Sequence, residues 1–280
     1  MRMKPIWLVV LLAVACGAVW GAYEYLVVAA RDTKGPSISF SEEELVVSVR
    51  DDRSKLLEGV TARDDRDGDV TGAVLVETIS AIRSDHSVTV TYAAFDKAGN
   101  VAKAVRNVRY SDYEPPRFSL SGPLMFRSGV GADPFAYIQA WDPLDGDLSS
   151  RVKVVMRSGE SSISNVGIYE VELRVTNKMG DTAKLQVPLE VYATGTYNAT
   201  VQLSDYLIYV EKGQTFDKDA YMEGVTLGGR IYDMDELPEG TRIRIDSDVR
   251  SGVPGVYIVD YTVTYGEYKG CSRLIVVVEE

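Results

Sequence analysis

After residue 30 the chain alternates apolar and polar residues over short runs, which is the period of a β-strand. Examples are VTVTYAAF at residues 88–95 and YEVELRV at 169–175, and Gly, Asp, Asn or Pro bounds each run. No stretch after Ala30 shows a convincing apolar stripe at helical spacing. Several short strands in about 80 to 100 residues predict an antiparallel β-sandwich.

The N-terminal segment has a different pattern, an almost unbroken apolar run from Ile6 to Val28. A helix rises about 1.5 Å per residue, so a run of this length crosses a hydrocarbon core of about 30 Å. Arg2 and Lys4 precede the run, and the positive-inside rule then keeps the N-terminus in the cytoplasm. We predict that residues 1–34 form a cytoplasmic tip, a transmembrane signal-anchor at about residues 6–28 and a short linker.

Two alternatives for this segment remain open. Residues 13–15 (Ala-Val-Ala) before Cys16 resemble a lipoprotein signal, although the residues after Cys16 stay apolar. Residues 28–30 (Val-Ala-Ala) would suit cleavage of a secretory signal, although the apolar run is long for one. All three interpretations export the rest of the chain.

The exported part repeats itself with a period of roughly 80 residues. LEGVTARDDRDGDV at 57–70 corresponds to YIQAWDPLDGDL at 137–148, and each is a strand that ends in an Asp-Gly-Asp turn. VTVTYAAFDKAGN at 88–100 likewise corresponds to YEVELRVTNKMGD at 169–181. A more divergent copy has MEGVTL at 222–227 and GVYIVDYTV at 255–263 but lacks the Asp-Gly-Asp turn. We predict three domains, the first, second and third repeat, at residues 35–112, 113–194 and 195–280.

These motifs resemble the bacterial immunoglobulin-like repeats of Gram-positive surface proteins. Members of that family typically carry an Asp-Gly-Asp-[Leu/Val]-Thr turn and then a Thr-Asp-x-Ala-Gly-Asn turn. The first repeat matches at 67–71 and 96–100, whereas the second keeps 145–149 but has Asn-Lys-Met-Gly-Asp at 177–181. The resemblance covers nearly all of the chain after Gly35. It implies three tandem immunoglobulin-like β-sandwich domains behind one transmembrane helix, an all-β fold. It says little about function, since such modules serve as spacers, adhesins and sugar-binding accessories.

The Gly-x-Tyr sequences at 167–169 and 255–257 carry a structural expectation. In immunoglobulin-like sandwiches a tyrosine at such a corner bonds through its hydroxyl to the backbone a few residues upstream. We expect Tyr169 and Tyr257 to do the same.

Composition narrows the function classes. The formal net charge of −11 disfavours nucleic-acid binding, because phosphates need a basic surface. Cys16 and Cys271 are too poorly placed to pair, as expected for a Gram-positive exported protein. The single histidine, His86, removes most histidine-dependent catalytic and metal sites. His86 lies between Asp85 and Ser87 just before a predicted strand, where we expect a solvated turn and not an active site. No carboxylate pair sits in a recognisable catalytic frame either, so we predict that the chain is not an enzyme.

The acidic turns are candidate ion sites, because calcium is held by oxygens from carboxylates and backbone carbonyls. The alternative is that Asp-Gly serves only the turn, since Asp and Gly suit its conformation. The candidate calcium ligands are Asp64, Asp65, Asp67, Asp69 and Asp96 in the first repeat and Asp142, Asp145 and Asp147 in the second.

Tyrosine is concentrated near the C-terminus, where nine of the 17 follow Thr196. Tyrosine is common at interfaces and stacks well on other rings, which predicts a ligand-binding surface on the third repeat. The alternative is that tyrosine simply suits half-buried strand faces, so that this repeat is a diverged terminal cap. The candidate ligand-binding residues are Tyr206, Tyr209, Tyr221, Tyr232, Tyr265 and Tyr268.

Together these features predict a single-pass cell-membrane protein with a cytoplasmic N-terminus and extracellular C-terminal domains. Such a protein would present tandem modules for adhesion or for contact with an extracellular glycan or protein. One alternative is a non-catalytic subunit of a cell-envelope assembly, polysaccharide or secretion machine. A more distant one is an accessory that positions a separate enzyme.

Overall fold

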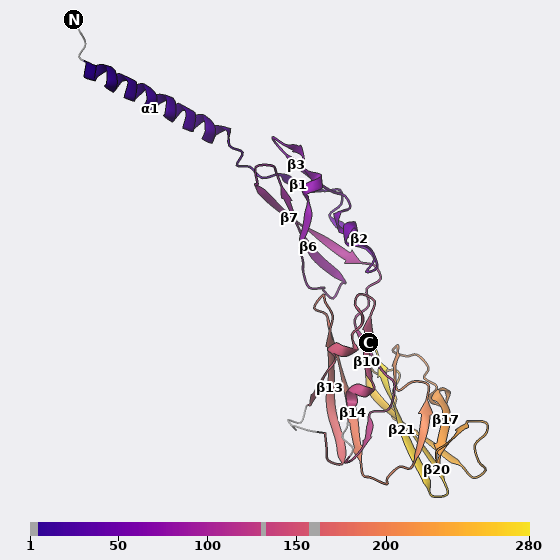
Figure 1. Ribbon diagram of the computed structural model, residues 1–280. Coiled ribbons are helices and arrows are strands. Elements are labelled where there is room, and N and C mark those ends of the chain that lie inside the picture. The colour runs from indigo at the N-terminus through magenta and orange to yellow at the C-terminus, as the bar shows by residue number, and fades with distance from the viewer. Residues whose placement is uncertain (1–4, 130–132, 157–162) are drawn as a thin grey trace. The chain divides into compact units, whose positions relative to one another are not determined.

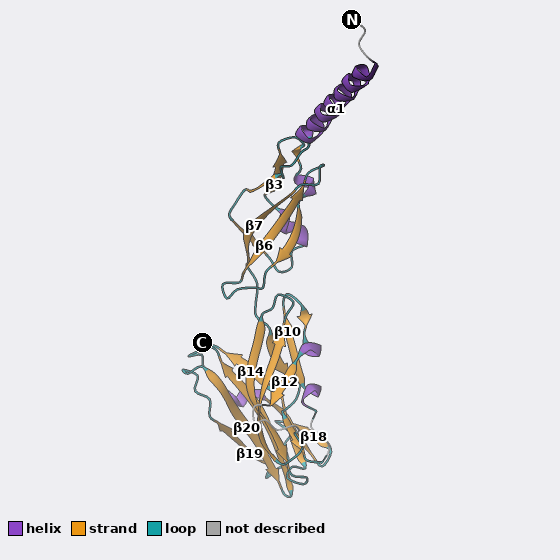
Figure 2. Cartoon of the chain, turned by 90° about the vertical axis from the view of Figure 1, so that its left-hand side faces the viewer, coloured by secondary structure: helices purple, strands orange, loops and turns teal. Residues whose placement is uncertain are grey.

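The computed structural model describes residues 5–129, 133–156 and 163–280. Within them one helix, α1 (Pro5–Ala30), precedes a chain made of short strands and brief 3-10 turns (Figures 1 and 2). The predicted all-β fold behind one N-terminal helix is therefore confirmed. Arg2 and Lys4, on which the predicted membrane orientation depends, lie outside the described residues.

The helix α1 is apolar on all sides apart from Glu24, which lies in its C-terminal part. Its stretch Trp7–Ala29 is 23 residues long, and none of it is buried inside the rest of the protein. A helix that is apolar all round is normally surrounded by a protein core or by lipid. This helix is thus long and apolar enough to cross a membrane, a property that an N-terminal signal sequence shares.

The chain divides into two compact units. The first contains α1 and most residues up to Ser111, and the second contains residues from Asp112 to Glu280. The second unit therefore contains both the second and the third repeat.

The first unit contains a sandwich of two sheets. One has the order β1-β3-β4 and the other β2-β7-β6-β5. All of these neighbours are antiparallel except β2 and β7, which run parallel. The prediction of a purely antiparallel sandwich is incomplete here. The N-terminal strand is divided into β1, which pairs with β3, and β2, which runs parallel to β7 in the other sheet. The strand bounds are β1 (Ser37–Phe40), β2 (Glu44–Val47), β3 (Val60–Asp64), β4 (Gly68–Asp69), β5 (Leu75–Ile79), β6 (Ser87–Phe95) and β7 (Val101–Tyr110).

Burial alternates along the central strand of this sandwich, as the period of two predicted. Val88, Val90 and Tyr92 of β6 are fully buried. The Tyr92 hydroxyl donates a hydrogen bond to the Leu56 carbonyl at 2.6 Å, so its polar atom is satisfied inside the core. Buried Arg106 similarly donates from Nη1 to the Glu58 carbonyl at 2.7 Å.

The second repeat has the same strand order. Its sheets run β8-β10-β11 and β12-β13-β14-β9, and β9 is again parallel to β14. Tyr169 donates its hydroxyl to the Asn165 carbonyl at 2.8 Å, which confirms the expected tyrosine corner. The strand bounds are β8 (Arg117–Leu120), β9 (Met125–Arg127), β10 (Ile138–Asp142), β11 (Gly146–Asp147), β12 (Lys153–Met156), β13 (Gly167–Thr176) and β14 (Thr182–Tyr192).

The strands of the third repeat form one connected sheet in the order β18-β17-β15-β21-β20-β19, with β16 also paired to β21. Its two halves join through a single pair, Ala199 and Gly270. A Cβ at Gly270 would lie 2.6 Å from the Ala199 carbonyl oxygen, so this close approach requires glycine. Tyr257 donates to the Val253 carbonyl at 2.9 Å, which confirms the second tyrosine corner. The strand bounds are β15 (Ala199–Leu203), β16 (Leu207–Val210), β17 (Met222–Leu227), β18 (Arg230–Asp233), β19 (Arg242–Ser247), β20 (Gly255–Tyr265) and β21 (Tyr268–Val278).

The second and third repeats share buried contacts. Leu207 and Ile275 of the third repeat belong to the hydrophobic cluster that fills the second. Beside them Arg273, with a side chain only 7% exposed, binds Asp260 through Nε at 2.7 Å. Its Nη2 also reaches Glu190 of β14 at 3.2 Å. The second unit therefore has a continuous core and a buried ion-pair network linking its two sheet systems.

Candidate functional site: two matched acidic turns

The acidic turns of the first two repeats use the same backbone geometry. Asp64, at the end of β3, accepts hydrogen bonds through Oδ1 from the N–H groups of Arg66 at 2.8 Å and Asp67 at 2.9 Å. Asp142, at the end of β10, accepts equivalent bonds from Leu144 and Asp145. These two aspartates therefore fold the turns that follow them, and the bonds from Asp67 and Arg66 lower the pKa of Asp64.

The last aspartate of each Asp-Gly-Asp motif also has a local role. Asp69 accepts from the N–H of Thr71, and Asp147 accepts from the N–H of Ser149, each at 2.9 Å. Hydrogen bonds from Thr71 and Ser149 lower the pKa of Asp69 and Asp147 respectively. In both repeats the last aspartate of the motif therefore stabilises its own turn, as the alternative to ion binding predicted.

In the first repeat three carboxylates meet beside the turn. Asp32, Asp64 and Asp96 each place one oxygen within 4.8 Å of the others. Asp64 is 3% exposed and Asp96 is 8% exposed, so their mutual repulsion is poorly screened by water. Arg66 approaches the group, with Nε 3.8 Å from Asp32 Oδ2. This is a donor set that suits a hard divalent cation.

The structure brings together only two of the five predicted ligands of the first repeat, Asp64 and Asp96. Asp67 instead accepts from the Lys97 N–H at 2.8 Å, and exposed Asp65 pairs with Lys34 at 3.1 Å. Asp32 was missed, because it lies in the linker before β1, far from the turn in sequence. Its only sequence signal is its position just before a predicted first strand.

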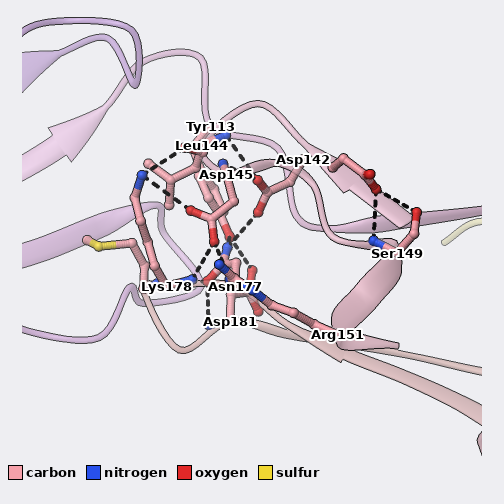
Figure 3. Close-up of polar contacts among 11 residues, drawn as sticks. Tyr113, Asp142, Leu144, Asp145, Ser149, Arg151, Asn177, Lys178 and Asp181 are labelled. Atoms are coloured by element: carbon pink, nitrogen blue, oxygen red, sulfur yellow. Dashed lines mark hydrogen bonds and ion pairs between the residues drawn. The ribbon is translucent and has the colours of Figure 1, made fainter. Parts of the chain in front are cut away.

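In the second repeat the corresponding position is filled by hydrogen-bond donors (Figure 3). Asn177 follows β13 as Asp96 follows β6, and its Nδ2 donates to Asp142 Oδ2 at 2.9 Å and to the Tyr113 hydroxyl at 2.8 Å. Tyr113 in turn donates to Asp181 Oδ2 at 2.7 Å. Burial and the bond to Asp181 raise the pKa of Tyr113, so it stays a neutral donor. An amide and a hydroxyl therefore satisfy the carboxylates here.

Asp145 is neutralised by two cations. Arg151 Nη1 lies 2.6 Å from Oδ2, and Lys178 Nζ lies 3.2 Å from Oδ1 (Figure 3). Burial alone would raise the pKa of Asp145, but hydrogen bonds from Lys178 and Arg151 outweigh it and the pKa is lowered. Among residues 5–129, 133–156 and 163–280, the predicted ligands of the second repeat form no carboxylate group comparable to that of the first.

The six candidate tyrosines of the third repeat are all partly buried. Tyr209 receives a hydrogen bond from the Phe118 N–H at 3.1 Å and lies under the Arg117 guanidinium. Tyr221 stacks on Phe216, and Arg230 lies over the Tyr232 ring. A ligand surface made from these tyrosines would use only their exposed edges. The side chains that pack against the core of the third repeat include Tyr206, Tyr221, Tyr232, Tyr265 and Tyr268.

Trp141 is among the exposed aromatic side chains that the sequence pattern did not single out as candidates. Trp141 is 54% exposed on β10, opposite Arg117 on β8 and Asp147 on β11. Its signal was the alternation of residues 138–142, which places Trp141 on the face opposite Ile138 and Ala140.

No family model matches the chain. Two curated proteins are similar to part of it. An uncharacterized 81.3 kDa protein of Acholeplasma phage L2 is 30% identical over 93 residues, which are 33% of this chain and 12% of that protein. The pesticidal crystal protein Cry22Aa of Bacillus thuringiensis is 26% identical over 129 residues, which are 45% of this chain and 16% of that protein. The chain thus spans less than a fifth of the length of either relative.

Solved structures show only a weak likeness. The CBM51-2 domain with GlcNAc and the INT domains of Clostridium perfringens ZmpB match with a TM-score of 0.23 and 15% identity, over 59% of this chain and 30% of that one. The lipoprotein BT2262 of Bacteroides thetaiotaomicron matches with a TM-score of 0.20 and 11% identity, over 86% and 98% of the two chains. Likenesses of this size carry no argument about function.

Proposed function

We propose that this chain is a membrane-anchored surface protein that presents tandem immunoglobulin-like modules of the bacterial repeat type to an extracellular glycan or protein. The observation that carries the proposal is α1, whose stretch Trp7–Ala29 is apolar except at Glu24 and is buried nowhere in the protein. A lipid bilayer supplies the apolar surroundings that such a helix needs. Folded β-modules follow the helix after a short linker.

The proposed orientation is supported by the charges that precede the helix. Arg2 and Lys4 favour a cytoplasmic N-terminus, which exports the modules. The proposal includes no catalytic role, because the chain has a single histidine, His86, which removes most histidine-dependent catalytic sites. Candidate contact surfaces are the exposed Trp141 face of the second repeat and the tyrosine edges of the third. Aromatic rings of this kind pack well on sugars and on proteins.

Membrane fractionation of the full chain tests the anchor. We expect the chain to stay in membranes washed with alkaline carbonate and to keep its N-terminal residues. A variant with Leu11→Lys and Val14→Lys should leave that fraction, since charges at the centre of a span each cost about 2.5–3.5 kcal/mol. Recovery of the unaltered chain as a soluble protein, or as a mature form that begins after residue 30, would contradict the proposal. Co-purification with a membrane complex, lost when α1 is exchanged, would instead favour the cell-envelope-machine alternative.

Calcium binding at Asp32, Asp64 and Asp96 is a further part of the proposal, because each of these three carboxylates places an oxygen within 4.8 Å of the others, where a divalent cation would relieve their repulsion. Calcium added to the full chain in detergent should stabilise the first unit by about 2.7 kcal/mol at a concentration one hundred times the dissociation constant. Magnesium should have a much smaller effect, since it gives up water reluctantly. Thermal unfolding followed by circular dichroism measures the shift.

Asp96→Asn should abolish this response, because it introduces the residue that the second repeat has at the same place. Asp147→Asn is the matched control in the second repeat and should leave the calcium response intact. If calcium does not shift the unfolding curve, or still shifts it in the Asp96→Asn variant, these carboxylates are not a calcium site and the aspartates serve only the turn.

A further inference from the structure

The strand β19, at the end of the third-repeat sheet, has one unpaired edge, because it pairs only with β20. The N–H of Asp248, which directly follows β19, donates to the Ile258 carbonyl at 3.3 Å. In an antiparallel ladder every second residue bonds to the same neighbour, so the even-numbered residues of β19 face β20. The N–H and C=O groups of Ile243, Ile245 and Ser247 therefore point away from β20. Within the described chain no other strand pairs with this row of donors and acceptors.

The end strands of the other two sandwiches are less suited to pairing. In the first repeat the register of β5 is irregular between Val76 and Thr78, a bulge that interrupts the edge. In the second repeat β12 spans only four residues. By contrast β19 has six residues in unbroken register with β20, and its inward side chains Ile243 and Ile245 are uncharged. Bulges, short strands and inward charges commonly stop a further strand from pairing, and β19 has none of the three.

A hollow of about 530 Å³ borders the inward side of β19. Its apolar lining comes from Ile243 and Ile245 of β19, Met222 of β17 and Met234, which follows β18. All four side chains are only half-buried, although the two isoleucines and Met222 also pack against the core of the third repeat. The core is therefore open to solvent along the edge where β19 lacks a neighbour.

A second hollow, of about 460 Å³, continues the first along the same segment. The two hollows share Lys218 and Asp219, and the second is also lined by Ser247, Val249 and Ser251. Every second residue from Ile243 to Ser251 thus borders one of the two hollows. A groove with this period suits a chain that is itself extended and turns every second side chain inward.

The charges at this edge indicate the chemistry of such a chain. Arg242 and Arg244 are exposed on the outer side of β19, and Arg244 pairs with Asp246 at 2.8 Å. The outer side of β19 therefore has more positive than negative charges, although the whole protein carries −11. An added antiparallel strand would place one set of side chains in the hollows and the other beside these arginines. A peptide in which apolar residues alternate with acidic ones matches both sides, and its backbone supplies the donors and acceptors that β19 lacks.

We propose that β19 binds an extended segment of another protein as an added antiparallel strand, with apolar side chains in the hollows and acidic ones beside Arg242 and Arg244. The inference rests on the proposed function and deepens it, since it names a peptide strand as the extracellular partner and the third repeat as its place of binding.

Binding of a fluorescein-labelled heptapeptide of alternating glutamate and leucine to the full chain in detergent tests this pairing. Fluorescence anisotropy gives the dissociation constant. Methylating the leucine amide nitrogens should weaken binding about tenfold or more, because these amides face β19 and lose their hydrogen bonds while every side chain stays. Methylating the glutamate amides, which face away from β19, is the matched control and should leave the affinity within about twofold. Equal affinities of the two methylated peptides, or a loss confined to the glutamate-methylated one, would overturn the pairing.

Arg242→Glu combined with Arg244→Glu locates the site on the protein. Both side chains are exposed, so we expect the melting temperature to stay within a few degrees. The affinity for the unmethylated peptide should fall about tenfold or more, and replacing its glutamates by lysines should restore binding. Arg53→Glu combined with Arg63→Glu, an equal change of charge at exposed positions of the first repeat, should have little effect. Similar affinities of the two double variants would overturn the site.

The same titration is made with cellohexaose as a competitor. Binding of this neutral oligosaccharide in place of the peptide, or no binding of the peptide at all, would also overturn the inference. Because the titration is made in detergent, it does not depend on how the chain meets the membrane. A chain missing from the membrane fraction of cells contradicts the proposed anchor, while the affinities of the two methylated peptides still decide the pairing with β19.

Discussion

Asn177→Asp should lower the free energy of unfolding of the second unit by about 2–4 kcal/mol at neutral pH. The substitution removes the Nδ2 donor that binds Asp142 Oδ2 at 2.9 Å and the Tyr113 hydroxyl at 2.8 Å. It also sets a second carboxylate against Asp142, whose side chain is fully buried. Urea unfolding at fixed pH measures the loss.

The pH dependence of this loss shows whether it comes from repulsion between carboxylates or only from the two lost hydrogen bonds. Two facing carboxylates raise the pKa of one of them above its unfolded value, so the destabilisation is present at high pH and is relieved as that carboxyl protonates. The cost of Asn177→Asp should therefore shrink between pH 7 and pH 5. Calcium should also recover part of it, since the variant reproduces the carboxylate pair of the first repeat. A cost below about 0.5 kcal/mol, or one independent of pH, would show that Asn177 does not neutralise the site.

Arg273→Met should destabilise the second unit by about 3 kcal/mol, because it leaves the carboxylates of Asp260 and Glu190 without the positive charge that pairs with them. Since Arg273 is nearly buried and lies between β14 and β20, its loss acts on both the second and the third repeat. We expect the second unit of the unaltered chain to unfold in one transition and that of the Arg273→Met variant to unfold in two.

The matched control is Arg117→Met. Arg117 pairs with Glu279 at 3.0 Å, but the two side chains are 50% and 35% exposed, so solvent screening limits the pair to less than about 1 kcal/mol. Similar costs for the two substitutions, or a transition that stays single in the Arg273→Met variant, would mean that the buried network does not couple the repeats.

The alternation of apolar and polar residues was sufficient to predict the strands and the all-β class, and the Gly-x-Tyr sequences predicted the tyrosine corners at Tyr169 and Tyr257. These features are local, since a strand buries every second residue whatever its partner. The repeated Asp-Gly-Asp motif likewise indicated matching turns, because the hydrogen bonds of Asp64 and Asp142 reach only two or three residues along the chain.

The contacts between side chains of different segments could not be predicted from the sequence pattern. Nothing local indicates that Asp32 meets Asp64 and Asp96, or that Lys178 and Arg151 neutralise Asp145. Leu207 and Ile275 look like ordinary strand residues, yet they belong to the core of the neighbouring repeat. The domain boundaries at 112/113 and 194/195 stay a prediction, since the chain forms two compact units and the second contains two repeats.

The most direct test of the central claim is protease treatment of intact cells that express the full chain with a C-terminal epitope. We predict that the chain is found in the membrane fraction of untreated cells, and that external protease removes the epitope from intact cells. A cytoplasmic marker protein should stay intact in the same cells. An epitope that is digested only after the cells are broken would place the modules inside the cell and contradict the account.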